Sequence, residues 1–213
     1  PIYVDNPLSL SGIPDATLDE DVPIDNHVHL PDHCTAAAGD PETFTYTITA
    51  NTQPNCGASI DGGNNLDINP AQHWHDTSTV TVEVDDGSHT NVDTFTITVN
   101  SLNDAPPTPV LEITPVDPLR DQDLTCTVTG PSVDPDGDAV QYTYTWHMSY
   151  NDVDAYGDAL QTTGPVGALS DTLSSDMTGE LEFWKCIVTP TDGVANGAPA
   201  TAVMRIASLA EYA

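Results

Sequence analysis

Alternation of apolar and polar residues marks the clearest elements of this chain. Two runs, Ser78 to Val84 and Asp93 to Val99, alternate Thr with Val, Phe or Ile, and an Asp-Asp-Gly turn lies between them. Successive side chains of a strand face opposite sides, so this pattern places one face in a core and the other in water. The two runs are predicted to form a β-hairpin.

Shorter runs of the same character recur along the whole sequence, separated by clusters of Gly, Pro and Asp. They cover residues 43–49 and 66–68 in the first half, and 111–115, 124–130, 140–148, 181–189 and 200–207 in the second. Helical periodicity with capping residues is not convincing anywhere. The chain is therefore predicted to be all-β, built from two tandem antiparallel β-sandwiches.

The Pro-rich stretch after Asn103 suggests where the two domains meet. With 213 residues, the chain is long enough for two modest domains. We expect an N-terminal extension over residues 1–9, a first sandwich over 10–104 and a second sandwich with a C-terminal tail over 105–213. Ile2 to Val4 and the tail from Ala202 are short segments able to pair with the exposed sheet edge of a neighbour. Alternatively, they are stubs of a longer array of repeats or frayed ends.

The charge balance restricts the partners. The chain contains three Lys and Arg residues and 33 Asp and Glu residues, which gives a formal net charge of −30. Nucleic acid and anionic membranes are disfavoured as partners, and no apolar stretch is long enough to predict membrane insertion. Of the acids, 26 are Asp, a residue that both forms turns and ligates Ca²⁺. Cations are expected to stabilise the fold by screening or ligation, unless the acids serve only as a solvated surface.

One acidic turn has the spacing of a calcium loop. Asp134, Asp136 and Asp138 occupy alternate positions around Gly137, and Asp192 of a later turn is a further candidate ligand. Crowded carboxylates favour a hard cation, here calcium, although the Glu that would complete an EF-hand is replaced by Thr145. The alternative is a turn whose carboxylates accept only local hydrogen bonds.

The histidines are grouped as well. One group contains His27, His29 and His33, and a second contains His73 and His75. Residues two apart in a strand share a face, so each His-X-His pair is able to present two imidazoles to Zn²⁺ or Cu²⁺. Alternatively, these are surface residues paired with nearby acids such as Asp32 and Asp76.

Four cysteines are distributed two to each half, and none forms a Cys-X-X-Cys motif. This argues against a zinc ribbon or a thioredoxin-type site and favours disulfides in an oxidising compartment. An extracellular or cell-surface location follows from that reading.

The second half resembles the immunoglobulin-like repeats of large bacterial surface proteins. The resemblance lies in its DPDGD, YTYTW, WKC and TPTDG segments and in the order Cys126, Trp146, Cys186. It implies a disulfide between Cys126 and Cys186 with Trp146 packed on it. Trp184 stands where the family has a Tyr, so only the packing role of that residue is expected. Pairing within each domain would then join Cys34 to Cys56.

The first half is similar to the cadherin-like repeats of bacterial and archaeal surface proteins, from LDEDVPI through TVTVEVDDG to VNSLNDAP. The family binds calcium at its domain linkers. The resemblance implies calcium ligands at Glu20, Asp85, Asn103 and Asp104. Two family ligands are missing, since Ser101 and Ala105 replace an Asp and an Asn. A linker stiffened only by Pro is the alternative.

No catalytic motif is present: there is no Gly-X-Ser-X-Gly elbow and no Gly-rich phosphate loop after a strand. The first hypothesis is therefore a non-catalytic extracellular structural protein, a calcium-stabilised subunit of a cell-surface filament that self-associates head to tail. The second is an adhesion or carbohydrate-binding pair of modules that contacts surface glycans or other surface proteins, with Tyr150 and Tyr156 as an aromatic platform. A histidine-based metal carrier is the third.

Overall fold

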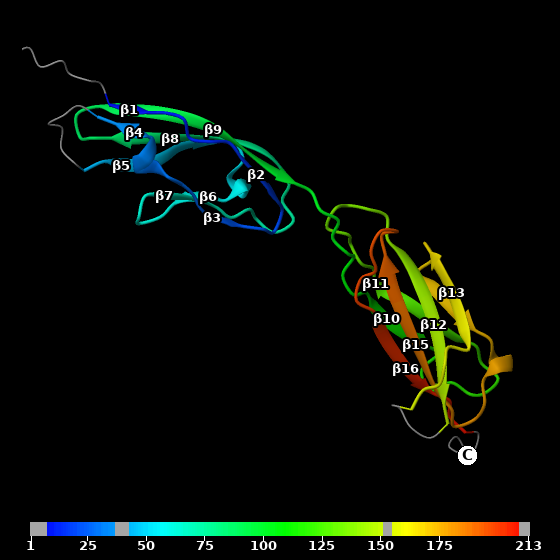
Figure 1. Cartoon of the computed structure of the whole chain (residues 1–213). Coiled ribbons are helices and arrows are strands. Elements are labelled where there is room, and N and C mark those ends of the chain that lie inside the picture. The colour runs from blue at the N-terminus through cyan, green and yellow to red at the C-terminus, as the bar shows by residue number, and fades with distance from the viewer. Residues whose placement is uncertain (1–7, 37–42, 151–154, 209–213) are drawn as a thin grey trace, which may run out of the picture. The chain divides into compact units, whose positions relative to one another are not determined.

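The computed structural model describes residues 8–36, 43–150 and 155–208 (Figure 1). Contacts divide the chain into two compact units, residues 1–102 and 103–213, and the expected boundary lies two residues further along. Ile2 to Val4, expected as a free strand, falls outside the described residues. The fold is all-β, as the alternation predicted, and its helices are short 3-10 turns. None of the described helices has the length and apolar character of a membrane span.

Unit 1 contains nine strands and two 3-10 turns in its described part. In chain order these are β1 (Ser9–Leu10), β2 (Ala16–Asp19), β3 (Ile24–His29), η1 (Leu30–His33), β4 (Cys34–Thr35), β5 (Thr45–Asn51), η2 (Pro54–Cys56), β6 (Ala58–Ile60), β7 (Asn65–Ile68), β8 (Asp76–Asp85) and β9 (Thr90–Asn100). They form a four-stranded sheet in the order β2-β9-β8-β5, a three-stranded sheet β3-β7-β6 and the short pair β1-β4.

The predicted hairpin is the centre of unit 1. Strands β8 and β9 pair without a register shift from Asp76 opposite Val99 to Asp85 opposite Thr90. The side chains of Val80, Val82 and Val84 are fully buried, whereas Thr81 and Glu83 between them are partly exposed. Strand β2 pairs with the other edge of β9 and runs parallel to it, whereas all other strand pairs of the described structure are antiparallel.

Unit 2 contains two facing sheets. Its elements are β10 (Val110–Thr114), β11 (Leu124–Gly130), β12 (Gln141–Ser149), β13 (Gln161–Val166), β14 (Ser170–Leu173), η3 (Ser175–Met177), β15 (Phe183–Thr191) and β16 (Ala200–Arg205). The sheet orders are β10-β11-β14 and β13-β12-β15-β16. Cys126, Trp146, Trp184 and Cys186 are fully buried in one core. Residues 202–205 of the tail, expected as a donor for a neighbouring molecule, are instead part of β16 and pair with β15 of the same sheet.

Candidate functional site

The Asp134–Asp138 turn closes on the carboxylate of its first residue. One oxygen of Asp134, Oδ1, accepts hydrogen bonds from the backbone N–H groups of Asp136 (3.0 Å) and Asp138 (3.3 Å). The backbone is turned by Gly137, whose N–H donates to the carbonyl of Asp134 and whose φ is +82°, a conformation that favours glycine. The turn therefore fixes the Asp134 side chain in one orientation.

The other oxygen of Asp134 is the exceptional atom of this turn. The residue is 5% exposed, and its Oδ2 has no hydrogen-bond partner among the described residues. A buried carboxylate oxygen without a donor or a cation is costly. An open hollow of about 310 Å³ lies beside the turn and is lined by Asp134, Asp138 and Tyr142 among others. The geometry thus presents a carboxylate oxygen without a partner in the lining of an open hollow.

Asp104 is bonded to this turn, and its neighbour Asn103 is bonded to Asp192. The Asp104 N–H donates to Oδ2 of Asp136 at 2.7 Å, and the Asn103 side-chain amide donates to Oδ2 of Asp192 at 2.9 Å. The pKa of Asp192 is lowered, first by the backbone N–H of Ala195 and then by the Asn103 amide, so this carboxylate stays ionised. Of the sequence-predicted ligands in this unit, the structure directly joins Asp104 to Asp136 and Asn103 to Asp192.

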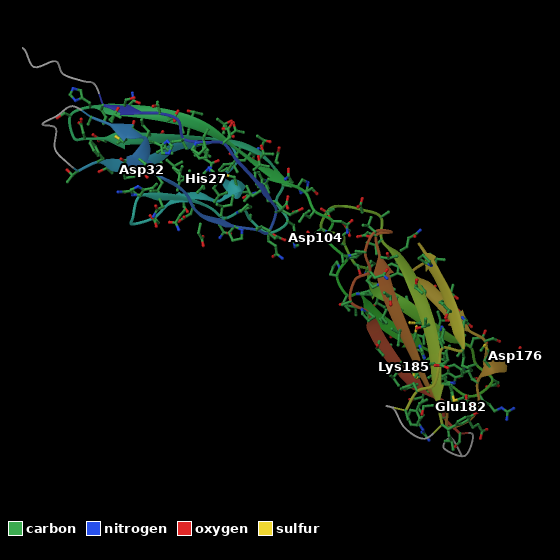
Figure 2. The ribbon with its side chains drawn as sticks, in the orientation of Figure 1. His27, Asp32, Asp104, Asp176, Glu182 and Lys185 are labelled. Atoms are coloured by element: carbon green, nitrogen blue, oxygen red, sulfur yellow. The ribbon has the colours of Figure 1, made fainter. Side chains whose placement is uncertain are left out.

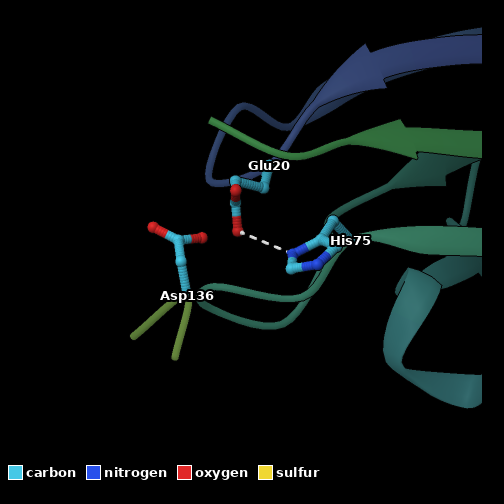
Figure 3. A group of neighbouring side chains, drawn as sticks. All are labelled: Glu20, His75 and Asp136. Carbon is cyan, nitrogen blue, oxygen red and sulfur yellow. Dashed lines mark ion pairs between the residues drawn. The ribbon is translucent and has the colours of Figure 1, made fainter. Parts of the chain in front are cut away.

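In unit 1, Glu20 is buried beside two histidines. It follows strand β2, and its N–H donates to the carbonyl of Asn100 at the end of β9. Its side chain is 2% exposed: Oε1 accepts from the Leu102 N–H at 2.6 Å, and Oε2 lies 3.7 Å from Nδ1 of His75 (Figure 3). His73 also has a ligand atom within 4.8 Å of the Glu20 carboxylate. Asp136, also drawn in Figure 3, belongs to unit 2.

Asp85, expected to bind the same calcium ion as Glu20, does not approach it. It lies at the hairpin end of β8, opposite Thr90, whereas Glu20 is bonded to Asn100 at the far end of β9. Ten residues of strand separate these two ends, which is roughly 30 Å. The Asp85 carboxylate instead accepts from the Gly87 N–H at 2.6 Å, so it stabilises the local turn.

The first histidine group is dispersed over separate partners. His27, labelled in Figure 2, belongs to β3. Its ring stacks on Phe95 with a centroid distance of 6.4 Å, and its Nε2 lies 3.1 Å from the carbonyl of Pro14. His29 pairs through Nδ1 with Asp32 at 3.3 Å, the surface alternative foreseen from the sequence. Asn26, which precedes His27 in β3, has a φ of +54°, and the register of β3 against β7 shifts between Ile24 and Val28.

The four cysteines are free thiols in the structure, and their neighbours differ between the two units. Cys126 and Cys186 contact each other in the core of unit 2, and this contact, followed by burial, raises the pKa of Cys186. Cys34 instead contacts Tyr46, and burial together with Cys34 raises the pKa of that phenol. The thiol of Cys56 lies against Asn51 at 3.3 Å.

Cys34 and Cys56 have different neighbours on β5. Their neighbours Tyr46 and Asn51 are five residues apart on β5, which is roughly 16 Å of strand. A disulfide requires Cα atoms about 4.4–6.8 Å apart, and the Cys34–Cys56 bridge stays a prediction. The predicted Cys126–Cys186 bridge stays a prediction with both side chains in place.

The two tyrosines expected to form a sugar platform have different surroundings. Tyr150 is 67% exposed and borders a pocket of about 360 Å³ with Met148 and Leu160. One face of the Tyr156 ring is covered by Lys185, whose Nζ lies 4.1 Å from the ring centroid (Figure 2). Tyr150 is thus the aromatic side chain left available at this surface.

The sequence did not predict a buried hydrogen bond between Trp184 and Glu182, which precede Cys186 in the chain. Trp184 Nε1 donates to Oε2 of Glu182 at 3.0 Å, and the same oxygen accepts from the Gly179 N–H at 2.6 Å. Trp184 therefore makes a hydrogen bond in addition to packing, which the loss of the family's phenol had seemed to exclude. The sequence signal was Glu182, two residues before Trp184, because it is the one acid in the strand predicted over residues 181–189.

Comparisons with known proteins return similar folds and no family. No protein-family model and no curated protein matches the chain. Similar solved structures include protocadherin gamma B7 extracellular cadherin domains 1–4 (17% identity, TM-score 0.46, 96% of this chain and 50% of that chain), so this chain spans half the length of that protein. Others are human protocadherin-24 EC1-2 (14%, 0.47, 93% and 97%) and the FN1-FN3 domains of chicken CNTN1 (10%, 0.36, 91% and 63%).

Proposed function

We propose that the chain is a non-catalytic extracellular structural protein whose second unit is stabilised by calcium. The observation that supports this most directly is the buried, unpartnered Oδ2 of Asp134 in a turn rich in carboxylates. The candidate ligands are oxygens of Asn103, Asp104, Asp134, Asp136, Asp138 and Asp192. Hard oxygen donors of this kind suit Ca²⁺, which takes six to eight oxygens in flexible geometry.

The chain's charge gives the proposed ion a structural purpose. At −30, the folded state is opposed by repulsion between carboxylates, which an ion held by several of them relieves. Calcium at 100 times its Kd would add about 2.7 kcal/mol to the stability of unit 2. For a domain of this size, we expect a rise in Tm on the order of 10 °C.

The test is thermal unfolding with Ca²⁺ or with chelator, in the native chain and in Asp134→Asn. Asparagine keeps the acceptor for the two turn N–H groups but removes the buried charge. We expect Asp134→Asn to be at least as stable as the native chain without Ca²⁺ and to lose the calcium-dependent rise in Tm. Asp176→Asn, which removes one charge from an exposed position of the same unit, is the matched control. A calcium response that survives in Asp134→Asn, or is absent in the native chain, contradicts the proposed site.

Head-to-tail self-association is the larger part of the proposed function. It is supported by the tandem β-sandwich units and by their unpaired edge strands, β5 in unit 1 and β16 in unit 2. Such edges present free backbone groups to another chain. Sedimentation and negative-stain imaging with and without Ca²⁺ test this, and monomers under both conditions would contradict a filament.

Adhesion through glycans is the second candidate function, favoured by the exposed Tyr150 beside its pocket. An aromatic ring with one open face is a common contact for sugar rings. Binding on a glycan array that is lost in Tyr150→Ala would support it, and an array without any signal would remove it.

A further inference from the structure

The end of unit 1 where β2, β8 and β9 meet brings two imidazoles to one buried carboxylate. Asp19, the last residue of β2, pairs with Asn100 of β9, and Asp76, the first residue of β8, pairs with Val99. Glu20 and His75 are the next residues beyond these two strands, on either side of the end of β9. The topology therefore brings their side chains together, and the His75–Glu20 separation is 3.7 Å.

The carboxylate of Glu20 is only partly satisfied. One of its oxygens is bonded to the Leu102 N–H, but Oε2 accepts no hydrogen bond from any described residue and faces the His75 ring. A carboxylate that is 2% exposed requires a compensating positive charge. A metal ion held by the carboxylate and a neighbouring neutral imidazole would supply that charge.

The second imidazole, His73, is held by a carboxylate behind it. Asp21 accepts from the His73 N–H through Oδ1 at 3.0 Å, and its Oδ2 lies 3.6 Å from Nδ1 of the ring. Metal-binding histidines usually present one ring nitrogen to the ion while the other faces a carboxylate in this way. Trp74, between the two histidines, packs against the core of unit 1 and anchors the segment.

We infer that Glu20, His73 and His75 form a binding site for a first-row transition metal ion of the Zn²⁺ class. Two imidazoles and one carboxylate are a ligand set for Zn²⁺, with water in the remaining position. Calcium prefers oxygen ligands alone, so the imidazoles distinguish this site from the proposed calcium turn. Ligand atoms on one Zn²⁺ lie about 3.3 Å apart, so the 3.7 Å pair needs little adjustment. His73 has a ligand atom within 4.8 Å of the Glu20 carboxylate, and its ring must move toward His75 for both imidazoles to share one ion.

The experiment is titration of the full chain with Zn²⁺ by calorimetry, near neutral pH and in excess Ca²⁺ to occupy exposed carboxylates. Co²⁺ provides a second readout, because its visible absorption reports the coordination geometry. We expect one tight Zn²⁺ per chain, and an affinity at least tenfold lower in His73→Gln and in His75→Gln. Both side chains are partly exposed, so the variants should fold, which metal-free thermal unfolding verifies.

His89→Gln is the matched control. His89 also faces a buried carboxylate, that of Asp86 at 3.6 Å, but it lies at the hairpin end of unit 1 and has no second imidazole in its motif. It should keep native Zn²⁺ affinity and the native Co²⁺ spectrum. The inference is overturned if the native chain takes up no Zn²⁺ in excess Ca²⁺, or if His73→Gln and His75→Gln bind Zn²⁺ as tightly as the native chain. The calcium proposal uses none of these residues, so the two outcomes are independent.

Discussion

The hydrogen bond between Trp146 and Asp171 permits a quantitative test of how unit 2 is held together. Trp146 is fully buried on β12, and its Nε1 donates to Oδ2 of Asp171 on β14 at 2.8 Å. The two residues belong to opposite sheets, so this bond crosses the sandwich. Gln161 donates to the same oxygen at 2.8 Å. Trp146→Phe keeps an aromatic ring in the core but removes this donor.

The expected cost has two parts. Loss of a hydrogen bond to a charged acceptor contributes about 1.5–3 kcal/mol. The space left by the smaller ring adds about 1 kcal/mol, because a packed core relaxes only in part. We therefore expect Trp146→Phe to destabilise unit 2 by about 2.5–4 kcal/mol.

Chemical denaturation followed by fluorescence measures this cost. Trp184 remains as the reporter of unit 2, and Trp74 reports unit 1, whose transition should not move. A double-mutant cycle with Asp171→Ala, which removes the acceptor, isolates the pair, and we expect a coupling energy above about 1 kcal/mol. A coupling below about 0.3 kcal/mol would refute the reasoning, since the cost would then come from packing alone.

Three further outcomes follow from the structure. Gly57→Ala should destabilise unit 1 by more than about 3 kcal/mol in the same denaturation assay, because φ of Gly57 is +70° and the new Cβ would lie 1.6 Å from the Asn69 carbonyl oxygen. Gly87→Ala should cost only about 1 kcal/mol, because Gly87 has a φ of +89° but open space around the new Cβ. The pKa of Asp86 is lowered, first by the His89 N–H and then by the Ser88 N–H, so its contribution to stability is complete above pH of about 4 and is lost as the pH falls; Asp86→Asn should flatten that part of the stability profile of unit 1. Non-reducing peptide mapping should link Cys126 to Cys186, and reduction should lower the stability of unit 2 by up to about 4 kcal/mol, whereas a link from Cys34 to a cysteine of unit 2 would contradict the pairing.

The strands that were predictable are those whose two faces differ. Strands β8, β9, β11, β12 and β15 alternate buried and exposed side chains, and the residue pattern records this directly. Strands β3 and β13 were missed because most of their side chains are at least partly exposed, so neither shows an apolar stripe. The strand at Ala16–Asp19 was missed because its position depends on parallel pairing with residues 81 positions away.

In the candidate sites too, contacts between residues close in sequence were predictable, whereas contacts between residues far apart in sequence were not. Spacing alone identified the Asp134 turn, because its hydrogen bonds join residues two and four apart. The burial of Glu20 depends on β9, and its histidine partner depends on β8, so no local pattern distinguishes it from the other acids. Asp85 was misplaced because the linker resemblance gave no information on how far the hairpin extends.

The parallel pairing of β2 with β9 determines how unit 1 responds to a mechanical load. These strands are close to the two ends of the unit, and Ala16 to Asp19 lie beside Ile97 to Asn100 in the same direction. A force that pulls the chain apart from before Ala16 and after Asn100 slides one strand along the other, so the hydrogen bonds between them are loaded together in shear. An antiparallel arrangement would expose them to tension one at a time, like a zipper.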